Sequence, residues 1–278
     1  MTANTMVRLD ESCENFGKDN GLIHEAVVTG RKVGAGQNFW AKLAHDEELF
    51  EKVVALVAGN GIIASISAVI VNYKPTPSQI RAREIMGKNY LGIEEVVRQF
   101  GAAYTEEQLA LLAEIPFSEV VLEKCKDTHI LVAGFPMTIL DVRAKAPNKK
   151  PKTFYSYKDA WYNNQSFAKD EKLEVRWYLI RKEAVVGSTS KNFDDQKALL
   201  SECEEVPRAC ELVYAVVLYF LVTGERLFPN LYVRTMSLDS DGIRVVVGYF
   251  GSDGLFVGSF WDDVRYVLLG VASARKSE

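Results

Sequence analysis

"PRACELVYAVVLYFLVTG", residues 207–224, is the stretch that decides the fold of this chain. Pro207 is a residue favoured at the first position of a helix, and Gly224 is one that commonly ends a helix. The residues between them are apolar around the whole helical circumference, so the pattern predicts a helix that is buried on all sides. Its apolar run, residues 212–222, is much shorter than the roughly 20 residues that cross a bilayer. A similar run at residues 61–71 also predicts a buried element and no membrane span.

Short strand patterns follow this helix to the end of the chain. They are separated by turns of Asp, Ser and Gly at residues 239–242 and 251–254. The strands predicted there are LYVRTMS (231–237), GIRVVVGYF (242–250) and LLGVASARK (268–276). Calcium binding at the first turn is not indicated, because an EF-hand loop with Gly242 as its sharp-turn glycine would end at Gly248 instead of a glutamate.

Upstream of the helix, strand and helix patterns alternate. Residues 128–145 predict one or two strands and residues 173–182 predict another, whereas residues 158–170 and 192–203 predict helices. Strands that flank one or two helices are typical of an α+β domain, which we expect over residues 128–278.

The N-terminal part of the chain has a different character. Residues 1–37 are polar and rich in glycine and predict a loose segment, and residues 38–127 predict a small helical region. Amphipathic patterns lie at residues 38–59, 78–87, 92–101, 105–116 and 118–125. Thr105 and Gln108 have the spacing of a capping box, and the prolines of KPTPSQ (74–79) predict a linker or hinge. We expect this region to serve as a support, as a homo-oligomerisation surface or as an attachment to another component.

Composition narrows the class of partner. The net charge is −4, without a long block of like charge, so we expect no nucleic-acid partner. The four cysteines and three histidines are scattered, so the sequence predicts no disulfide framework, no metal and no cofactor. The first residues do not form a signal peptide. We expect synthesis in the cytosol, and the final location stays open, including a virion or a cell surface reached by another route.

Five aspartates near the C-terminus leave a hydrolase-like enzyme as an alternative: Asp239, Asp241, Asp253, Asp262 and Asp263. Paired carboxylates can perform acid–base catalysis, but the spacing does not bring these residues together, and aspartates are common in surface turns. A third alternative is a structural or virion component whose C-terminus merely packs.

The last coding stretch has the composition of a binding surface. In VGYFGSDGLFVGSFWDDVRYVLLG, residues 247–270, aromatic residues alternate with Gly, Ser and Asp. Tyr and Phe offer large contact areas at low entropic cost, and Gly and Ser offer space and adaptable hydrogen bonds, which is the mixture found in antibody paratopes. The pattern therefore favours recognition of a macromolecular ligand, protein or glycan.

The chain from about residue 80 to its end resembles a known family. The resemblance is carried by REIMGKNYLGIEEVVRQFG (83–101), EIPFSEVVLEKCKDTHILVA (114–133), DAWYNNQSFAKD (159–170), STSKNFDDQKALLS (188–201), TGERLFPNLYVR (223–234) and WDDVRYVLLGVASARK (261–276). These motifs resemble the variable proteins of diversity-generating retroelements, which occur in phages and in many bacteria and archaea of reduced genome. In that family a reverse transcriptase copies a template repeat, randomises its adenines and writes the copy into the end of the gene.

The resemblance implies a C-type lectin-like fold for residues 128–278, of the branch shared with formylglycine-generating enzymes. It implies a hypervariable ligand-binding protein that is not an enzyme. Formylglycine-generating enzymes use cysteines late in the chain, and here no cysteine follows Cys210.

The resemblance also implies which residues vary. A template codon for Asn, randomised at its adenines, cannot yield Lys, Glu, Gln, Met or Trp. Twelve positions suit such codons and form the candidate ligand-binding surface: Ile243, Val246, Tyr249, Gly251, Phe256, Gly258, Ser259, Phe260, Val264, Tyr266, Val267 and Leu268. The residues between them are then scaffold: Arg244, Val245, Gly248, Ser252, Asp253, Gly254, Leu255, Trp261, Asp262, Asp263, Arg265 and Gly270. Variable residues must contribute little to folding, so we expect the twelve side chains to point outward.

Overall fold

The computed structural model describes residues 24–32, 36–46, 62–64, 69–71, 73–147, 151–156 and 158–277. The chain divides into two compact units, Met1–Gly61 and Ile62–Glu278. In the first unit, residues 24–32 and α2 (Gln37–His45) are helical. The start of the amphipathic pattern at 38–59 is thus helical, while its continuation and most of the expected loose segment lie outside the described residues.

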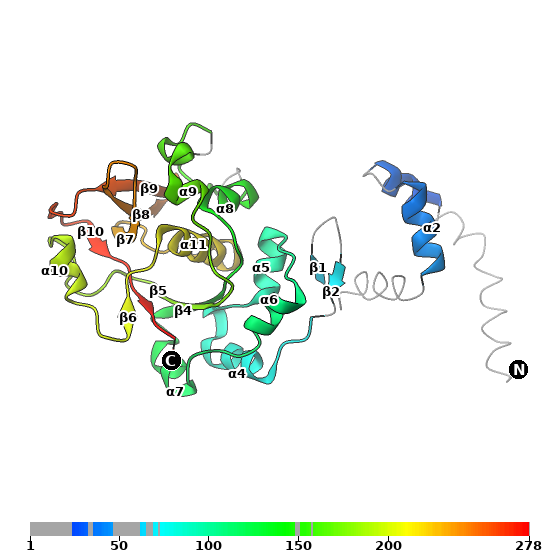
Figure 1. The fold of residues 1–278 in the computed structure, drawn as a ribbon, viewed down its shortest axis with the longest axis horizontal. Helices are drawn as coiled ribbons and strands as arrows, with labels where there is room; N and C mark the ends of the chain where they lie inside the picture. The colour runs from blue at the N-terminus through cyan, green and yellow to red at the C-terminus, as the bar shows by residue number, and fades with distance from the viewer. Residues whose placement is uncertain are drawn as a thin grey trace, which may run out of the picture. The chain divides into compact units, whose positions relative to one another are not determined.

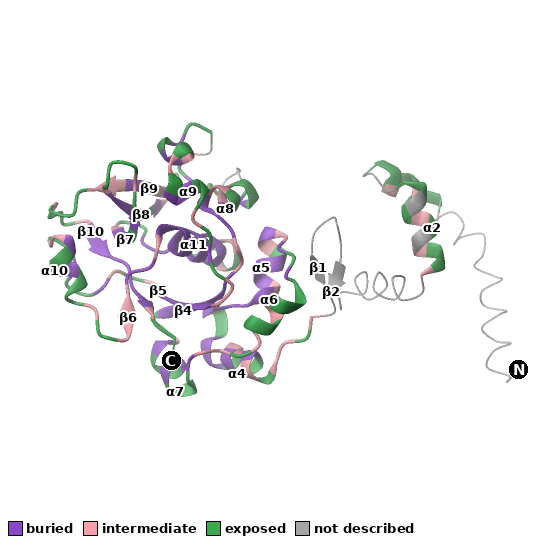
Figure 2. Ribbon diagram, in the orientation of Figure 1, coloured by how far each residue is buried: buried purple, intermediate pink, exposed green. Residues whose placement is uncertain are grey.

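The second unit is built around α11 (Ala209–Thr223), the helix predicted from its apolar sequence. Every residue from Ala209 to Phe220 is buried, which is visible as a continuous purple helix in Figure 2. The helix begins later than expected: Arg208 is the N-cap, so Pro207 lies before the helix and not at its first position. Glu211 explains this start, because its carboxylate accepts a hydrogen bond from the Arg208 backbone N–H at 2.8 Å. Gly224 ends the helix as predicted, with a φ of 76°.

Two sheets enclose this helix (Figure 1). The five-stranded sheet has the order β3-β4-β5-β11-β6, formed by β3 (Tyr90–Leu91), β4 (His129–Ala133), β5 (Trp177–Arg181), β11 (Ala274–Arg275) and β6 (Glu204–Glu205). The four-stranded sheet has the order β10-β7-β8-β9, formed by β10 (Leu269–Val271), β7 (Tyr232–Leu238), β8 (Arg244–Gly251) and β9 (Gly254–Phe260). β3 pairs with β4 and β10 pairs with β7 in parallel, and the remaining pairs of these sheets are antiparallel. The unit is therefore of the α+β class, as predicted.

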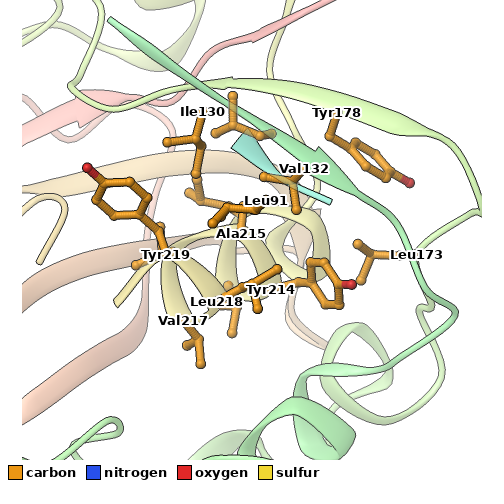
Figure 3. Close-up of a cluster of buried hydrophobic side chains, with 14 of the residues drawn as sticks. Leu91, Ile130, Val132, Leu173, Tyr178, Tyr214, Ala215, Val217, Leu218 and Tyr219 are labelled. Carbon is orange, nitrogen blue, oxygen red and sulfur yellow. The ribbon is translucent and has the colours of Figure 1, made fainter. Parts of the chain in front are cut away.

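Both sheets contribute to one hydrophobic core. Ala215 of α11 faces Leu91, Ile130 and Val132 of the five-stranded sheet, and Leu218 on the other side of the helix belongs to the same core (Figure 3). The four-stranded sheet adds buried valines from its inner face to the same core, namely Val233, Val245 and Val247. Because each of these side chains is fully or almost fully buried, the core fixes the position of both sheets.

The helices upstream of β4 belong to the same unit. They are α4 (Pro77–Met86), η1 (Gly87–Asn89), α5 (Ile93–Phe100), α6 (Glu106–Leu111) and α7 (Glu119–Cys125). Their buried apolar residues join the common core, and β3 pairs with β4 in register from Tyr90 to Leu131. The division of the chain therefore lies at Gly61/Ile62, and the boundary expected near residue 128 falls inside one compact unit.

Several local predictions need correction. Residues 139–145 form a helix, α8 (Ile139–Lys145), and not a second strand, because Thr138 and Asp141 make a capping box. The KPTPSQ segment starts α4 in the same way, with Thr76 as N-cap. The apolar run at 61–71 contains an antiparallel pair, β1 (Ile62–Ala64) and β2 (Val69–Val71). β9 was not among the expected strands.

The other predicted helices are present in shorter form. They are η2 (Trp161–Asn164), α9 (Ser166–Lys169) and α10 (Phe193–Lys197), and the predicted capping box of Thr105 and Gln108 opens α6. None of the helices in the described part of the chain combines the length and the apolarity that a membrane span requires.

Candidate functional site

The four-stranded sheet has an inner face on α11 and an outer face on which the candidate site lies. Side chains alternate between the faces of a strand, and Val245 and Val247 of β8 point into the core. The strand register places Tyr232, Gly248 and Phe256 opposite one another in a single row. This row belongs to the outer face.

Six aromatic side chains meet on this face and form what we call the aromatic cluster: Tyr155, Tyr232, Tyr249, Phe256, Phe260 and Tyr266. Tyr232 lies at its centre, with ring centroids 5.1 Å from Tyr249, 5.6 Å from Phe256 and 5.9 Å from Phe260. Tyr155 extends the cluster beyond Phe256, and Tyr266 extends it beyond Phe260. Tyr249 is 47% exposed and Tyr266 is 40% exposed, so the rings form a surface and not an interior.

A β-bulge turns Tyr249 toward the cluster. The pairing of β8 with β9 shifts between Gly248 and Gly251, and without that shift Tyr249 would alternate to the inner face. Gly248 has a φ of 141°, and a side chain there would lie 2.2 Å from the backbone oxygen of Leu231. Tyr249 itself has a φ of 45°, which is unusual for a residue with a side chain. The bulge therefore stacks Tyr249 on Tyr232 at the cost of local backbone strain.

The segment after β9, residues 261–268, is held in place through its backbone carbonyls. The guanidinium of Arg234 donates to the carbonyls of Trp261 at 2.9 Å and Val264 at 2.7 Å. Three backbone N–H groups donate to further carbonyls of the segment: Phe193 to Asp262 at 2.8 Å, Ser190 to Tyr266 at 3.0 Å and Tyr232 to Leu268 at 2.8 Å. These contacts fix the path of the segment without using the side chains of Val264, Tyr266, Val267 or Leu268.

Arg234 is completely buried, although its side chain carries a charge. Besides the two carbonyls above, it donates to the carbonyl of Lys191 at 3.2 Å and to Gln196 Oε1 at 2.9 Å. Burial lowers the pKa of Arg234, because a desolvated charge is disfavoured, but an arginine stays protonated at neutral pH. The four acceptors thus surround a permanent cation.

A second arginine fixes the same segment from its beginning. Arg244 binds the Asp262 carboxylate through two nitrogens, at 3.0 and 2.8 Å, and its guanidinium carbon lies 4.0 Å from the Phe193 ring centroid. This hydrogen bonding lowers the pKa of Asp262. The Asp262 carboxylate is therefore ionised, and its role is structural: it holds the segment through its ion pair with Arg244.

Ten of the twelve expected surface positions are exposed or half-buried. The two exceptions are Val246 and Gly258. Val246 is 0% exposed, which contradicts its expected outward position. In the sheet it is paired with Arg234 on one side and with Gly258 on the other. A side chain at Gly258 would meet the Phe256 ring at 2.6 Å, so these two positions are coupled.

The structure does not gather all twelve positions. Phe256, Gly258 and Phe260 share the outer face, whereas Ser259 alternates to the other side of β9. Ile243 directly precedes β8, and Gly251 is the last residue of that strand. Among the expected scaffold residues, the Trp261 side chain is 55% exposed, and Arg234 binds the carbonyl of this residue.

Sequence reasoning missed two members of the aromatic cluster. Tyr232 lies in a predicted strand next to Val233, which points into the core. Because neighbouring side chains of a strand point to opposite faces, Tyr232 could have been assigned to the outer face. Tyr155 had no such signal, because it reaches the cluster through an isolated parallel bridge between Phe154 and Leu255.

The five aspartates of the enzyme alternative are not brought together. Asp239 caps the β7–β8 turn by accepting from the backbone N–H groups of Asp241 and Ile243, at 3.0 and 2.9 Å. Asp253 lies at the other end of β8, in the β8–β9 turn. Asp262 is bound by Arg244. Within the described ranges no group of three or more His, Cys, Asp and Glu side chains could hold a metal ion.

Comparison of the chain with family models, with curated proteins and with solved structures gives no match.

Proposed function

We propose that this chain is a hypervariable ligand-binding protein of the diversity-generating retroelement type, with a C-type lectin-like fold in its C-terminal part. The aromatic cluster and the 261–268 segment form the binding surface. The ligand is a macromolecule, protein or glycan, and the chain performs no catalysis.

The observation that carries the proposal is the backbone anchoring of residues 261–268. A surface that tolerates many side chains needs a fixed main chain whose position does not depend on those side chains. Here Arg234 holds two carbonyls of the segment, and Arg244 holds Asp262. Neither arginine is among the twelve exchangeable positions, so exchange leaves the anchors intact.

The chemistry of the surface supports recognition. Val267 is 65% exposed next to Tyr266, and together with the exposed rings of the aromatic cluster they form an apolar patch. Such patches mark interaction sites, and aromatic residues dominate binding energies within them. The positive φ of Tyr249 adds a specific argument, because Asn tolerates that conformation better than Tyr and a template codon for Asn is expected there.

The test is the DNA beside the gene. We expect a second, near-identical copy of the final coding segment that differs from the first only opposite template adenines, next to a gene for a reverse transcriptase. The differences should fall on the codons of exposed positions such as Tyr249, Tyr266 and Val267, and should spare those of Arg234 and Arg244. A flanking region without such a repeat would refute the proposal.

A further inference from the structure

A small pocket lies at one end of the aromatic cluster and shares Tyr155 and Phe256 with it. It has a volume of about 240 Å³ and lies between the segment around η2 and the edge strand β9. Four aromatic residues line it, namely Tyr155, Trp161, Tyr162 and Phe256, together with Asp159. Only Phe256 belongs to the twelve exchangeable positions, so the pocket is made mainly of fixed residues.

The aromatic walls are held by main-chain contacts. The indole N–H of Trp161 donates to the carbonyl of Val257 at 2.8 Å. The Tyr155 N–H donates to the Leu255 carbonyl at 3.0 Å, and the Leu255 N–H donates to the Thr153 carbonyl at 2.9 Å. These bonds attach both walls to β9, so the pocket is formed before any ligand arrives.

Neighbouring rings in the pocket lining are steeply inclined to each other. The Tyr155 and Phe256 rings are inclined by 65° at a centroid distance of 5.7 Å, and the Trp161 and Tyr162 rings by 90° at 6.0 Å. A flat platform suits a sugar ring, whereas rings that face a common space from several directions enclose a compact group. The volume points the same way, because pockets for whole small molecules are usually about 300–1,000 Å³.

The charge of the pocket selects the ligand. Asp159 is the one charged residue among the described residues that line it, and this carboxylate forms no ion pair with another described residue. Aromatic faces attract cations, most strongly at Trp. A carboxylate without an ion-pair partner in the described part of the chain, next to three partly exposed rings, therefore favours a cation that also has apolar surface.

We propose that this pocket binds an alkylammonium head group of the size of trimethylammonium. The positive charge faces Asp159, and the methyl groups contact Tyr155, Trp161 and Phe256. The pocket thereby provides a fixed subsite beside a surface whose other side chains are exchangeable. This inference does not depend on exchange, because it uses only the charge and shape of the residues present.

The test compares choline with its uncharged isostere, in which a tert-butyl group replaces trimethylammonium. Both are titrated into the full chain, and binding is followed by calorimetry and by the indole N–H resonance of Trp161. Choline should bind at least tenfold more tightly than the isostere, a difference of about 1.4 kcal/mol. Nε-Trimethyllysine, titrated in parallel, distinguishes a lysine side chain from a choline head group as the source of the cation.

Two variants test the walls and the charge. Trp161→Leu should weaken choline binding about tenfold, and Asp159→Asn about threefold. Asp159 is exposed, so its substitution keeps the chain folded even if loss of Trp161 does not. Val120→Ser, at an exposed apolar position of α7 outside both the pocket and the binding surface, is the matched control and should leave choline affinity unchanged.

Equal affinity for choline and for the isostere would overturn the inference. A choline affinity that neither Trp161→Leu nor Asp159→Asn lowers would overturn it as well. Failure of the native chain to bind choline or trimethyllysine would overturn it as well. A gene without a template repeat but with choline-selective binding would refute the proposed function and leave this site standing.

Discussion

Replacing Arg234 with methionine tests the physical basis of the proposed binding surface. Methionine fills part of the same space but cannot donate hydrogen bonds. The change removes the Arg234 donor from four acceptors: the carbonyls of Lys191, Trp261 and Val264, and Gln196 Oε1. Of these, the Trp261 carbonyl keeps the Val264 N–H as a donor at 3.2 Å. Two of these acceptors, the carbonyls of Trp261 and Val264, belong to the 261–268 segment, so that segment should loosen.

The expected loss of unfolding free energy is about 3–5 kcal/mol, because the Lys191 and Val264 carbonyls and Gln196 Oε1 lose their donor and each buried polar group left unsatisfied costs about 1–3 kcal/mol. Four charge-assisted hydrogen bonds at roughly 1.5–3 kcal/mol each would suggest a larger loss. Burial of the Arg234 charge offsets part of that sum, as its lowered pKa indicates. A loss of this size is a large fraction of the roughly 5–15 kcal/mol that stabilises a typical domain.

Urea denaturation measures the global effect, and amide hydrogen exchange at Val264, whose N–H donates to the Trp261 carbonyl at 3.2 Å, measures the local one. Arg265→Met is the control. Arg265 lies in the same segment, but its ion pair with Asp195 at 3.3 Å is about half exposed on both sides, so its loss should cost less than about 1 kcal/mol. If Arg234→Met and Arg265→Met prove equally mild, the backbone anchoring does not hold the segment and the reasoning fails.

Three further predictions concern the surface, the bulge and a buried histidine. Val267→Ser should lower the free energy of unfolding by less than about 1 kcal/mol, because that side chain is 65% exposed. Phe250→Ala should lower it by about 3–5 kcal/mol, because Phe250 is 0% exposed. Similar losses for both variants in urea denaturation would contradict the assignment of Val267 to the surface and Phe250 to the core. Gly248→Ala should lower the free energy of unfolding by more than about 3 kcal/mol, because the new Cβ would lie 2.2 Å from a backbone oxygen. Gly242→Ala should lower it by about 1–2 kcal/mol, because Gly242 has a φ of 78° but open space around it. Thermal unfolding measures the difference between the two variants, and equal losses would contradict this prediction. Burial lowers the pKa of His129 from 6.5 to about 4. Between these two pH values the imidazole is protonated in the unfolded chain and neutral in the folded chain, so the free energy of unfolding should rise with pH across that range. His129→Gln should flatten this rise, by up to roughly 3 kcal/mol, and an unchanged slope would show that His129 is not its source.

Much of the fold was predictable from local patterns. The apolar helix around Tyr214, the capping box of Thr105 and the Asp-Ser-Gly turns all depend on residues close together in the sequence. Such features follow from propensity and hydrogen bonding within a few residues, so the sequence alone indicates them. The prediction was incomplete where a local signal was overlooked, as at α8, where Thr138 caps a helix within residues 128–145, for which only one or two strands were predicted.

The sequence by itself determined the α+β class, the central buried helix and the aromatic character of the C-terminal stretch. Only the tertiary structure decided which of those aromatic side chains meet, because Tyr155 and Tyr232 join Phe256 through strand pairing between distant parts of the chain. It also decided that Val246 is interior and that Arg234 holds the 261–268 segment. The physical reason is that a residue's exposure and its partners depend on which face of the sheet another element covers, and that covering comes from residues far away in the sequence.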